Sequence, residues 1–269
     1  MPSTPTAQQL NQARQAFIPD YRSQWEPTGR WVRAKFAGET VADSKRVMLL
    51  RQTGRLPVYY FPQSDVRLDL MTPSGTSRDQ ALGEATRYTV KAGQRSAPDA
   101  AWTYTNPGQE APAVKGYVAF EWNAMDAWFE EDDEVYVHPR DPYKRIDVMH
   151  SSRHVQVIVG GVAVADTRRP RLLFETSLPT RYYIPKQDVR MDLLAPSDNH
   201  TRCPYKGLAS YYSVRVGDHF YEDLAWYYPF PVPECPKIEN LICFYNEKVD
   251  AVIVDGEEQE RPFTQFVKV

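Results

Sequence analysis

A long internal repeat constrains the fold of this chain more than any other feature of its sequence. Residues 59–70 (YYFPQSDVRLDL) match residues 182–193 (YYIPKQDVRMDL) at an offset of 123 residues. Offsets of 123 or 124 residues also relate Val41 with Val164, Tyr88 with Tyr212, Trp102 with Trp226, Phe120 with Phe244 and Asp126 with Asp250. This period is too long for a solenoid unit, so the sequence predicts one small domain that is used twice.

The repeat also sets the expected domain organisation of the 269 residues. We predict an N-terminal arm (1–29), a first repeat (30–134), a connector (135–151), a second repeat (152–256) and a C-terminal tail (257–269). The arm carries one predicted helix, because Leu10, Ala13 and Phe17 form a sparse apolar stripe. Pro139 and Pro142 stiffen the connector, so we expect the two repeats to pack against each other in a fixed arrangement.

The residue pattern within each repeat predicts an all-β fold. Val32, Ala34 and Phe36 alternate with basic residues, which is typical of a half-buried strand. In the second repeat, two apolar segments (155–159 and 162–165) flank a Gly-Gly pair and predict a hairpin. The chain is also rich in Tyr (17) and Pro (22), residues that suit short strands joined by turns. Helical periodicity is weak throughout both repeats.

Residues 188–193 (DVRMDL) show a period of two, and we predict a strand there with apolar and charged side chains on opposite faces. Asp188 and Asp192 would lie about 13 Å apart along such a strand, too far to share one metal ion. The charged face has two interpretations. It is either a solvated surface of ion pairs, or a surface on which Arg190 meets an anionic ligand.

Composition and charge exclude several classes of protein. The net charge of −3 lacks the basic footprint of a nucleic-acid-binding protein. No apolar run approaches the roughly 18 residues of a membrane span. The three cysteines form no Cys-x-x-Cys motif, and the five histidines lack metal-site spacing, so we expect no metal and no cofactor. The start of the chain does not resemble a signal peptide, so we expect a reduced, cytoplasmic protein.

Several motifs of the second repeat resemble one known family. These are FETSLPTRYYIP (174–185), DVRMDLLAPS (188–197) and TRCPYKGLASYYSV (201–214). They are similar to the family called domain of unknown function 427, which has also carried a nucleotidyltransferase-like label. The connector WFEEDDEVYVHPRDPYKRIDV (128–148) resembles the junction of bacterial tandem members. The resemblance implies a β-tent, a small assembly of short twisted sheets, but it implies little about function.

The nucleotidyltransferase label finds no support in the residues. That chemistry requires a Gly-Ser phosphate loop and closely spaced carboxylates for two metal ions. The sequence contains neither pattern.

The segment Cys203-Pro204-Tyr205-Lys206 is the strongest candidate for catalysis. A thiol near an ammonium group can become a nucleophile, and Pro204 predicts a turn that returns Lys206 toward Cys203. The alternative is a small buried Cys with a lysine that reaches solvent. The first repeat has Asp79 and Leu82 at the corresponding positions, so any such chemistry belongs to the second repeat.

A second candidate site combines aromatic and basic residues of the second repeat. Arg181 and Lys206 would bind negative charge, and Tyr182, Tyr212 and Trp226 would form the walls of a pocket. Arg190 is a further candidate from the charged segment described above. The alternative for Trp226 is core packing, and strand alternation allows only half of these side chains to share one face.

The sequence therefore supports three functional hypotheses. The leading one is binding of a small polar or anionic metabolite by the second repeat. The first alternative is an enzyme of transferase or hydrolase type that uses Cys203 as a nucleophile with Lys206. The second alternative is a structural or interaction module.

Overall fold

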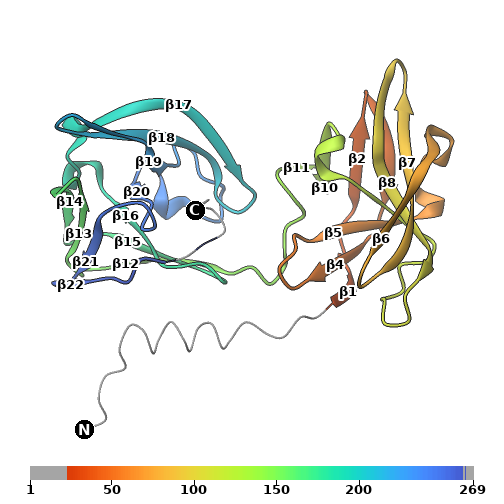
Figure 1. Ribbon diagram of the computed structural model, residues 1–269, viewed down its shortest axis with the longest axis horizontal. Coiled ribbons are helices and arrows are strands. Elements are labelled where there is room, and N and C mark those ends of the chain that lie inside the picture. Colours follow the sequence, from red (N-terminus) through yellow and green to blue (C-terminus); the bar gives the residue numbers. More distant parts are fainter. Residues whose placement is uncertain (1–22, 263, 265–269) are drawn as a thin grey trace, which may run out of the picture. The chain divides into compact units, whose positions relative to one another are not determined.

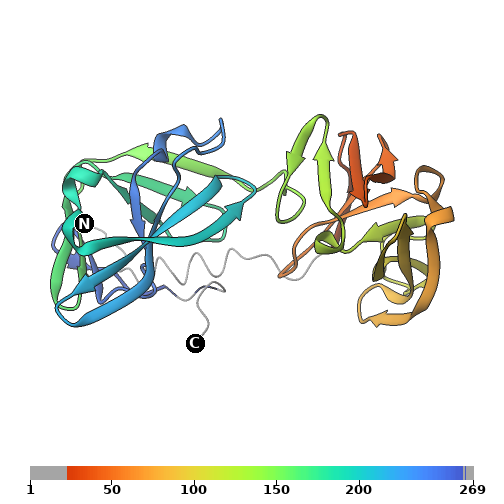
Figure 2. The ribbon, with the colours of Figure 1, turned by 90° about the horizontal axis from the view of Figure 1, so that it is seen from above.

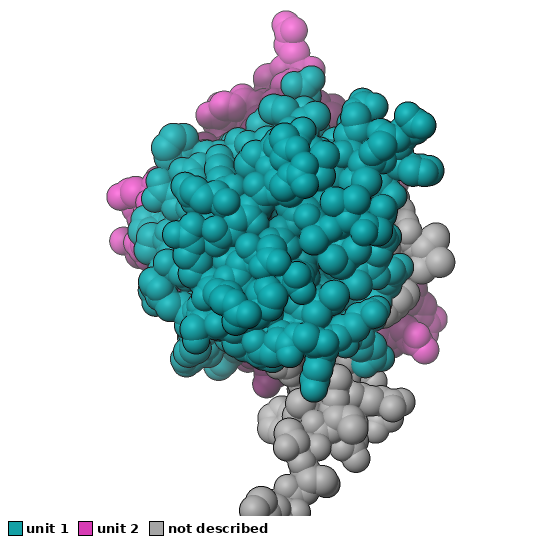
Figure 3. Space-filling view, turned by 90° about the vertical axis from the view of Figure 1, so that its left-hand side faces the viewer, with its two compact units in different colours: residues 1–18, 142–269 teal, residues 19–141 magenta. Residues whose placement is uncertain are grey.

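A computed structural model describes residues 23–262 and residue 264, and it confirms the all-β prediction. The described chain divides into two compact units, one that ends at Asp141 and one that begins at Pro142 (Figure 3). Each domain builds its sheets only from its own strands (Figures 1 and 2). The helix predicted in the N-terminal arm lies outside the described residues.

In the first domain, the described residues form a seven-stranded sheet of order β1-β4-β5-β9-β8-β7-β6 and a four-stranded sheet of order β11-β10-β2-β3. All neighbouring strands are antiparallel. The strands are β1 (Ser23–Pro27), β2 (Val32–Phe36), β3 (Glu39–Ser44), β4 (Met48–Gln52), β5 (Val58–Pro62), β6 (Met71–Asp79), β7 (Gly83–Ala92), β8 (Arg95–Pro107), β9 (Tyr117–Phe120), β10 (Ala127–Glu130) and β11 (Asp133–Val135). Residues 23–27, assigned above to the arm, pair with β4.

The second domain has the same design, with a seven-stranded sheet of order β12-β15-β16-β20-β19-β18-β17 and a four-stranded sheet of order β14-β13-β21-β22. The strands are β12 (Ile146–His150), β13 (Val155–Val159), β14 (Val162–Thr167), β15 (Arg171–Glu175), β16 (Arg181–Ile184), β17 (Leu194–Cys203), β18 (Gly207–Val216), β19 (His219–Tyr227), β20 (Ile242–Phe244), β21 (Ala251–Val254) and β22 (Glu257–Glu258). Residues 146–150, assigned above to the connector, pair with β15.

Each four-stranded sheet joins strands from opposite ends of its repeat. In the first domain β10 pairs with β2, and in the second domain β21 pairs with β13. The predicted hairpin of β13 and β14 is present, and Gly160 and Gly161 turn it with positive φ angles of 56° and 73°. Glycine adopts these angles without the steric cost that a side chain adds.

The seven-stranded sheet of the second domain has an apolar cluster on each face. Neighbouring residues of one strand, such as Leu172 and Leu173 or Tyr182 and Tyr183, belong to different apolar clusters, because successive side chains of a strand point to opposite faces. One cluster contains residues of the four-stranded sheet and forms the core between the two sheets. The other cluster includes residues of the segment between β19 and β20.

The strand predicted over residues 188–193 is wrong. This segment forms two short 3-10 turns, η4 (Lys186–Asp188) and η5 (Met191–Leu193). The backbone N–H of Asp188 donates to the carbonyl of Pro185 at 2.9 Å, which closes the first turn after β16. A period of two in sequence does not by itself distinguish a strand from two successive tight turns, whose hydrogen bonds are local.

Candidate functional site

The outer cluster is the apolar group on the face of the seven-stranded sheet that points away from the four-stranded sheet. Its buried members are Leu173, Tyr183, Ala209, Tyr211, Trp226, Tyr228, Cys235, Ile238 and Cys243. Cys203 and Tyr245 pack against it from its edge. Two ion pairs and all three cysteines of the chain lie in or beside this cluster. It therefore combines thiols with buried charged groups.

Arg181 forms a buried ion pair with Glu247. The guanidinium donates through Nη1 to Oε2 at 2.6 Å and through Nη2 to Oε1 at 2.5 Å. Thr264 adds a hydrogen bond to the same carboxylate at 2.8 Å. Burial alone would raise the pKa of Glu247, but the hydrogen bonds and charge of Arg181 outweigh it, so the pKa lies below its usual value. The charge of Arg181 is therefore already balanced within the domain.

Lys206 forms the second ion pair, with Glu175. The ammonium Nζ lies 2.5 Å from Oε2 of Glu175, and the Nζ of Lys144 lies 3.5 Å from the other carboxylate oxygen. Burial lowers the pKa of Lys206, but the neighbouring Cys203 and Glu175 raise it more, so the pKa lies above its usual value. Lys206 is thus a cation at neutral pH, and two ammonium groups share one carboxylate.

Cys203 ends β17 and begins a tight turn. The backbone N–H of Lys206 donates to the carbonyl of Cys203 at 3.4 Å, so the turn places the two residues of this motif side by side. All three cysteines lie within the described residues, and Cys203 alone is partly exposed, whereas Cys235 and Cys243 are buried. Burial raises the pKa of Cys235 to about 11 and that of Cys243 to about 12, so both remain protonated thiols.

Trp226 packs in the outer cluster, which agrees with the core-packing alternative given for this residue in the sequence analysis. Its indole Nε1 donates to the hydroxyl of Tyr183 at 3.2 Å, and its ring centroid lies 4.5 Å from that of Tyr245. The guanidinium of Arg181 lies 5.5 Å from the indole ring centre. Of the residues selected from the sequence, the structure thus brings Arg181 and Trp226 together. Cys203, which shares a turn with Lys206, packs against the same cluster.

The other three candidate residues lie elsewhere. Tyr182 points from β16 into the core between the sheets, on the opposite face from Arg181. Tyr212 packs against that same core, and its ring stacks on Tyr227 at 5.2 Å. Arg190 is exposed and pairs with Asp192 through two hydrogen bonds of 2.8 and 2.6 Å. The strand alternation noted in the sequence separates the two tyrosines from the outer cluster.

Sequence reasoning missed the acidic partners in this site, Glu175 and Glu247. Glu175 belongs to the FETSLPTRYYIP motif, and the first repeat has Gln52 at its position, so this difference between the repeats was a usable signal. Glu247 corresponds to Asn123 in the first repeat. The first repeat therefore has uncharged residues in place of both acidic residues, and it also lacks both of their basic partners.

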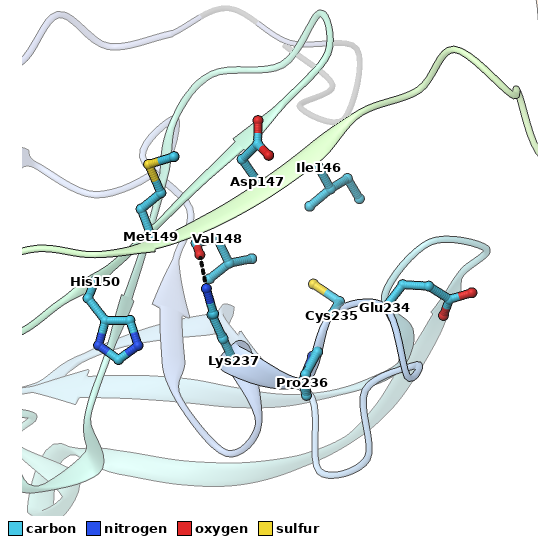
Figure 4. A pocket seen from close by; sticks show the side chains of 9 residues that line it. All are labelled: Ile146, Asp147, Val148, Met149, His150, Glu234, Cys235, Pro236 and Lys237. Carbon is cyan, nitrogen blue, oxygen red and sulfur yellow. Dashed lines mark hydrogen bonds between the residues drawn. The ribbon is translucent and has the colours of Figure 1, made fainter.

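A cavity of about 460 Å³ adjoins this cluster. Its walls are β12 and the residues around η6 (Pro236–Ile238), and Figure 4 shows the side chain of Cys235 directed from this segment toward β12. The lining residues are Ile146, Asp147, Val148, Met149, His150, Glu234, Cys235, Pro236 and Lys237. The ammonium of Lys237 donates to the carbonyl of Val148 at 3.1 Å, and this hydrogen bond joins the two segments that line the cavity (Figure 4).

Two searches of the described residues bear on function. Within residues 23–262 and 264, no group of three or more His, Cys, Asp or Glu side chains is arranged to hold a metal ion. No helix in that part of the chain is long and apolar enough to cross a membrane.

Comparison with known proteins supports the resemblance noted in the sequence. The family model described as domain of unknown function (DUF427) matches the chain twice, over residues 24–131 and 147–255. A search of curated proteins finds no match. The two matches cover most of the chain and coincide with the two structural domains. The chain is therefore a tandem member of the DUF427 family.

Proposed function

We propose that the second domain binds a small polar molecule in the cavity between β12 and residues 234–237. The observation that supports this proposal is the cavity itself, whose volume of about 460 Å³ is within the usual range for small-molecule sites. Its walls combine apolar groups with acidic and basic groups, a mixture that suits a compact polar ligand.

The charges around the cavity favour a neutral or zwitterionic ligand over a strongly anionic one. Arg181 and Lys206, the cations expected to bind an anion, each have a carboxylate partner. Lys237 uses one hydrogen bond on Val148, and an ammonium group has three donors, so it can also bind a ligand acceptor. Asp147 accepts from Arg145 at 2.7 Å but, as a carboxylate, can accept further bonds.

The test is a thermal-shift screen of polar metabolites against the full chain, followed by calorimetry of the compounds that raise the unfolding temperature. Lys237→Met should weaken binding at least tenfold, because it removes the only ammonium among the lining residues. Lys91→Met, an exposed substitution in the first domain, is the matched control and should leave binding unchanged. A ligand that binds equally well to both variants would place its site elsewhere.

A further inference from the structure

The outer cluster contains every cysteine of the chain. Cys235 and Cys243 are buried members, and Cys203 is partly buried and packs against the cluster. These residues come from three separate segments, the end of β17, the loop before η6 and β20. The first domain has no cysteine, and the positions of Cys203 and Cys235 hold Asp79 and Ala111 in the first repeat.

Two tight turns place Cys203 and Cys235 at the same end of the sheet. In the first turn Lys206 N–H donates to Cys203, and in the second Cys235 N–H donates to Val232 at 2.9 Å. Val232 N–H donates to the carbonyl of Lys206 at 3.1 Å, which joins the two turns directly. The turns therefore lie against each other, with one cysteine at the start of the first and the other at the end of the second.

Gly207 allows this close approach of the two turns. It bridges to Pro231 and has a φ of 108°, an angle that L side chains rarely adopt. A Cβ atom built at Gly207 would lie 3.1 Å from the carbonyl oxygen of Phe230, closer than such contacts normally allow. The chain at this point is thus built for contact between the segments that carry Cys203 and Cys235.

The three cysteines differ in their exposure to solvent, which determines which of them an oxidant can reach. Cys203 is partly exposed, Cys235 is 2% exposed, and Cys243 is 0% exposed. An oxidant in solution therefore meets Cys203 first.

We propose that Cys203 and Cys235 are a redox-active thiol pair that reduces hydroperoxides. This proposal does not rest on the ligand binding proposed above, although Cys235 also lines that cavity. It uses Cys203 in a different class of reaction from transferase or hydrolase chemistry. Lys206 closes the turn that begins at Cys203, through its backbone N–H, and so fixes the backbone of that residue. Cys243, buried on β20, takes no part.

The proposed reaction has two steps. The Cys203 thiolate attacks the terminal oxygen of a hydroperoxide; a sulfur–oxygen bond forms, the oxygen–oxygen bond breaks, and the departing alkoxide or hydroxide takes up a proton. The sulfur is oxidised to a sulfenic acid, and the peroxide is reduced to an alcohol or to water. The Cys235 thiol then attacks that sulfur, so that a disulfide forms and water leaves. An external dithiol returns the disulfide to two thiols by exchange.

Peptide mapping of the wild-type chain tests the proposal directly. The fully reduced protein is treated with hydrogen peroxide, the remaining thiols are alkylated under denaturing conditions, and the digest is analysed by mass spectrometry. We expect one intramolecular link between Cys203 and Cys235, with loss of two hydrogens, while Cys243 is alkylated. Oxidation of Cys203 without this link, or an equal yield of links to Cys243, would overturn the proposal.

Three matched serine variants separate the roles of the thiols. Cys203→Ser should abolish peroxide consumption. Cys235→Ser should leave a sulfenic acid on Cys203 that a cyclic dione traps, and Cys243→Ser should behave as wild type. If Cys235→Ser still turned over peroxide at the wild-type rate with added dithiol, Cys235 would not be the resolving thiol. These outcomes do not depend on metabolite binding, so either proposal can fail alone.

Discussion

The two domains share their sheet order but differ in what lies on the outer face of the large sheet. Some polar contacts occur twice. Arg46 pairs with Asp65 as Arg169 pairs with Asp188, and Arg67 pairs with Asp69 as Arg190 pairs with Asp192. A contact that both domains retain serves the fold that they share. The guanidinium of Arg190 is thus occupied in the same way as that of its first-domain counterpart.

The Lys206–Glu175 and Arg181–Glu247 pairs, in contrast, have no counterpart at the matching positions of the first domain. Lys206 and Glu175 correspond in the first repeat to Leu82 and Gln52, and Arg181 and Glu247 correspond to Val58 and Asn123. The first domain therefore reaches the same fold with uncharged residues at all four positions. A buried ion pair is often replaceable by well-packed apolar groups, so these pairs are not needed to specify the fold.

A third set of side-chain contacts occurs at matching positions in both domains but is made by different residue types. The second domain links Thr201, Tyr211 and Tyr245 through hydroxyl contacts of 2.7 and 3.4 Å. The first domain links Ser77, Arg87 and Glu121 at the corresponding positions, at 3.0 and 2.7 Å. The geometry is conserved between the domains while an ion pair replaces two phenols. The comparison therefore separates shared scaffold from residues particular to one domain.

The largest expected effect comes from leaving Arg181 without its partner. Glu247→Ala should destabilise the second domain by about 4 kcal/mol, because the buried guanidinium would have no carboxylate. The double variant Arg181→Val/Glu247→Asn, which carries the first-domain residues, should lose much less. The free energy of unfolding of the second domain, measured by urea titration, gives both losses. Equal losses in the single and double variants would show that the pair itself is essential.

The Lys206 pair should show the same pattern with a smaller amplitude. Lys206→Leu should cost about 2 kcal/mol, less than the loss at Arg181 because Lys144 remains near the Glu175 carboxylate. Adding Glu175→Gln to this variant reproduces the first-domain pair and should recover most of the loss. The comparison fails if the double variant is less stable than the single one.

The pH dependence of stability should change when the second domain carries the first-domain residues at positions 181 and 247. The pKa of Glu247 is lowered in the folded state, so its contribution is complete above the unfolded pKa of about 4.3 and is lost as pH falls through the folded value. Thermal unfolding between pH 3 and 6 should therefore show a steeper acid loss in wild type than in Arg181→Val/Glu247→Asn. Parallel profiles would mean that the carboxylate contributes no acid sensitivity.

The smallest effect should come from the repeated surface pair. Arg190→Ala and Arg67→Ala each remove an exposed ion pair, and such pairs contribute little to stability. We expect neither variant to shift the unfolding midpoint measurably, and neither to change ligand binding by calorimetry. Loss of binding in Arg190→Ala alone would restore the interpretation of Arg190 as a ligand contact.

The sequence predicted the duplication from matches at a fixed offset, and the all-β class from the local alternation of residues. Alternating residues at Val32–Phe36 and Val155–Val159 identified real strands. The strand prediction was wrong at residues 188–193, where local hydrogen bonds close two turns. Sequence reasoning also missed Glu175 and Glu247, which lie 31 and 66 residues from their basic partners. Those contacts depend on sheet register, which alternation within a single strand does not define.

The pairing of strands from opposite ends of each repeat has a consequence for synthesis. The small sheet of the first domain lacks β10 until the chain has been made as far as residues 127–130, and that of the second domain lacks β21 until residues 251–254. Contacts so distant in sequence form late, because the intervening chain must first be available. On the ribosome, each domain therefore closes as a unit, the first well before the second.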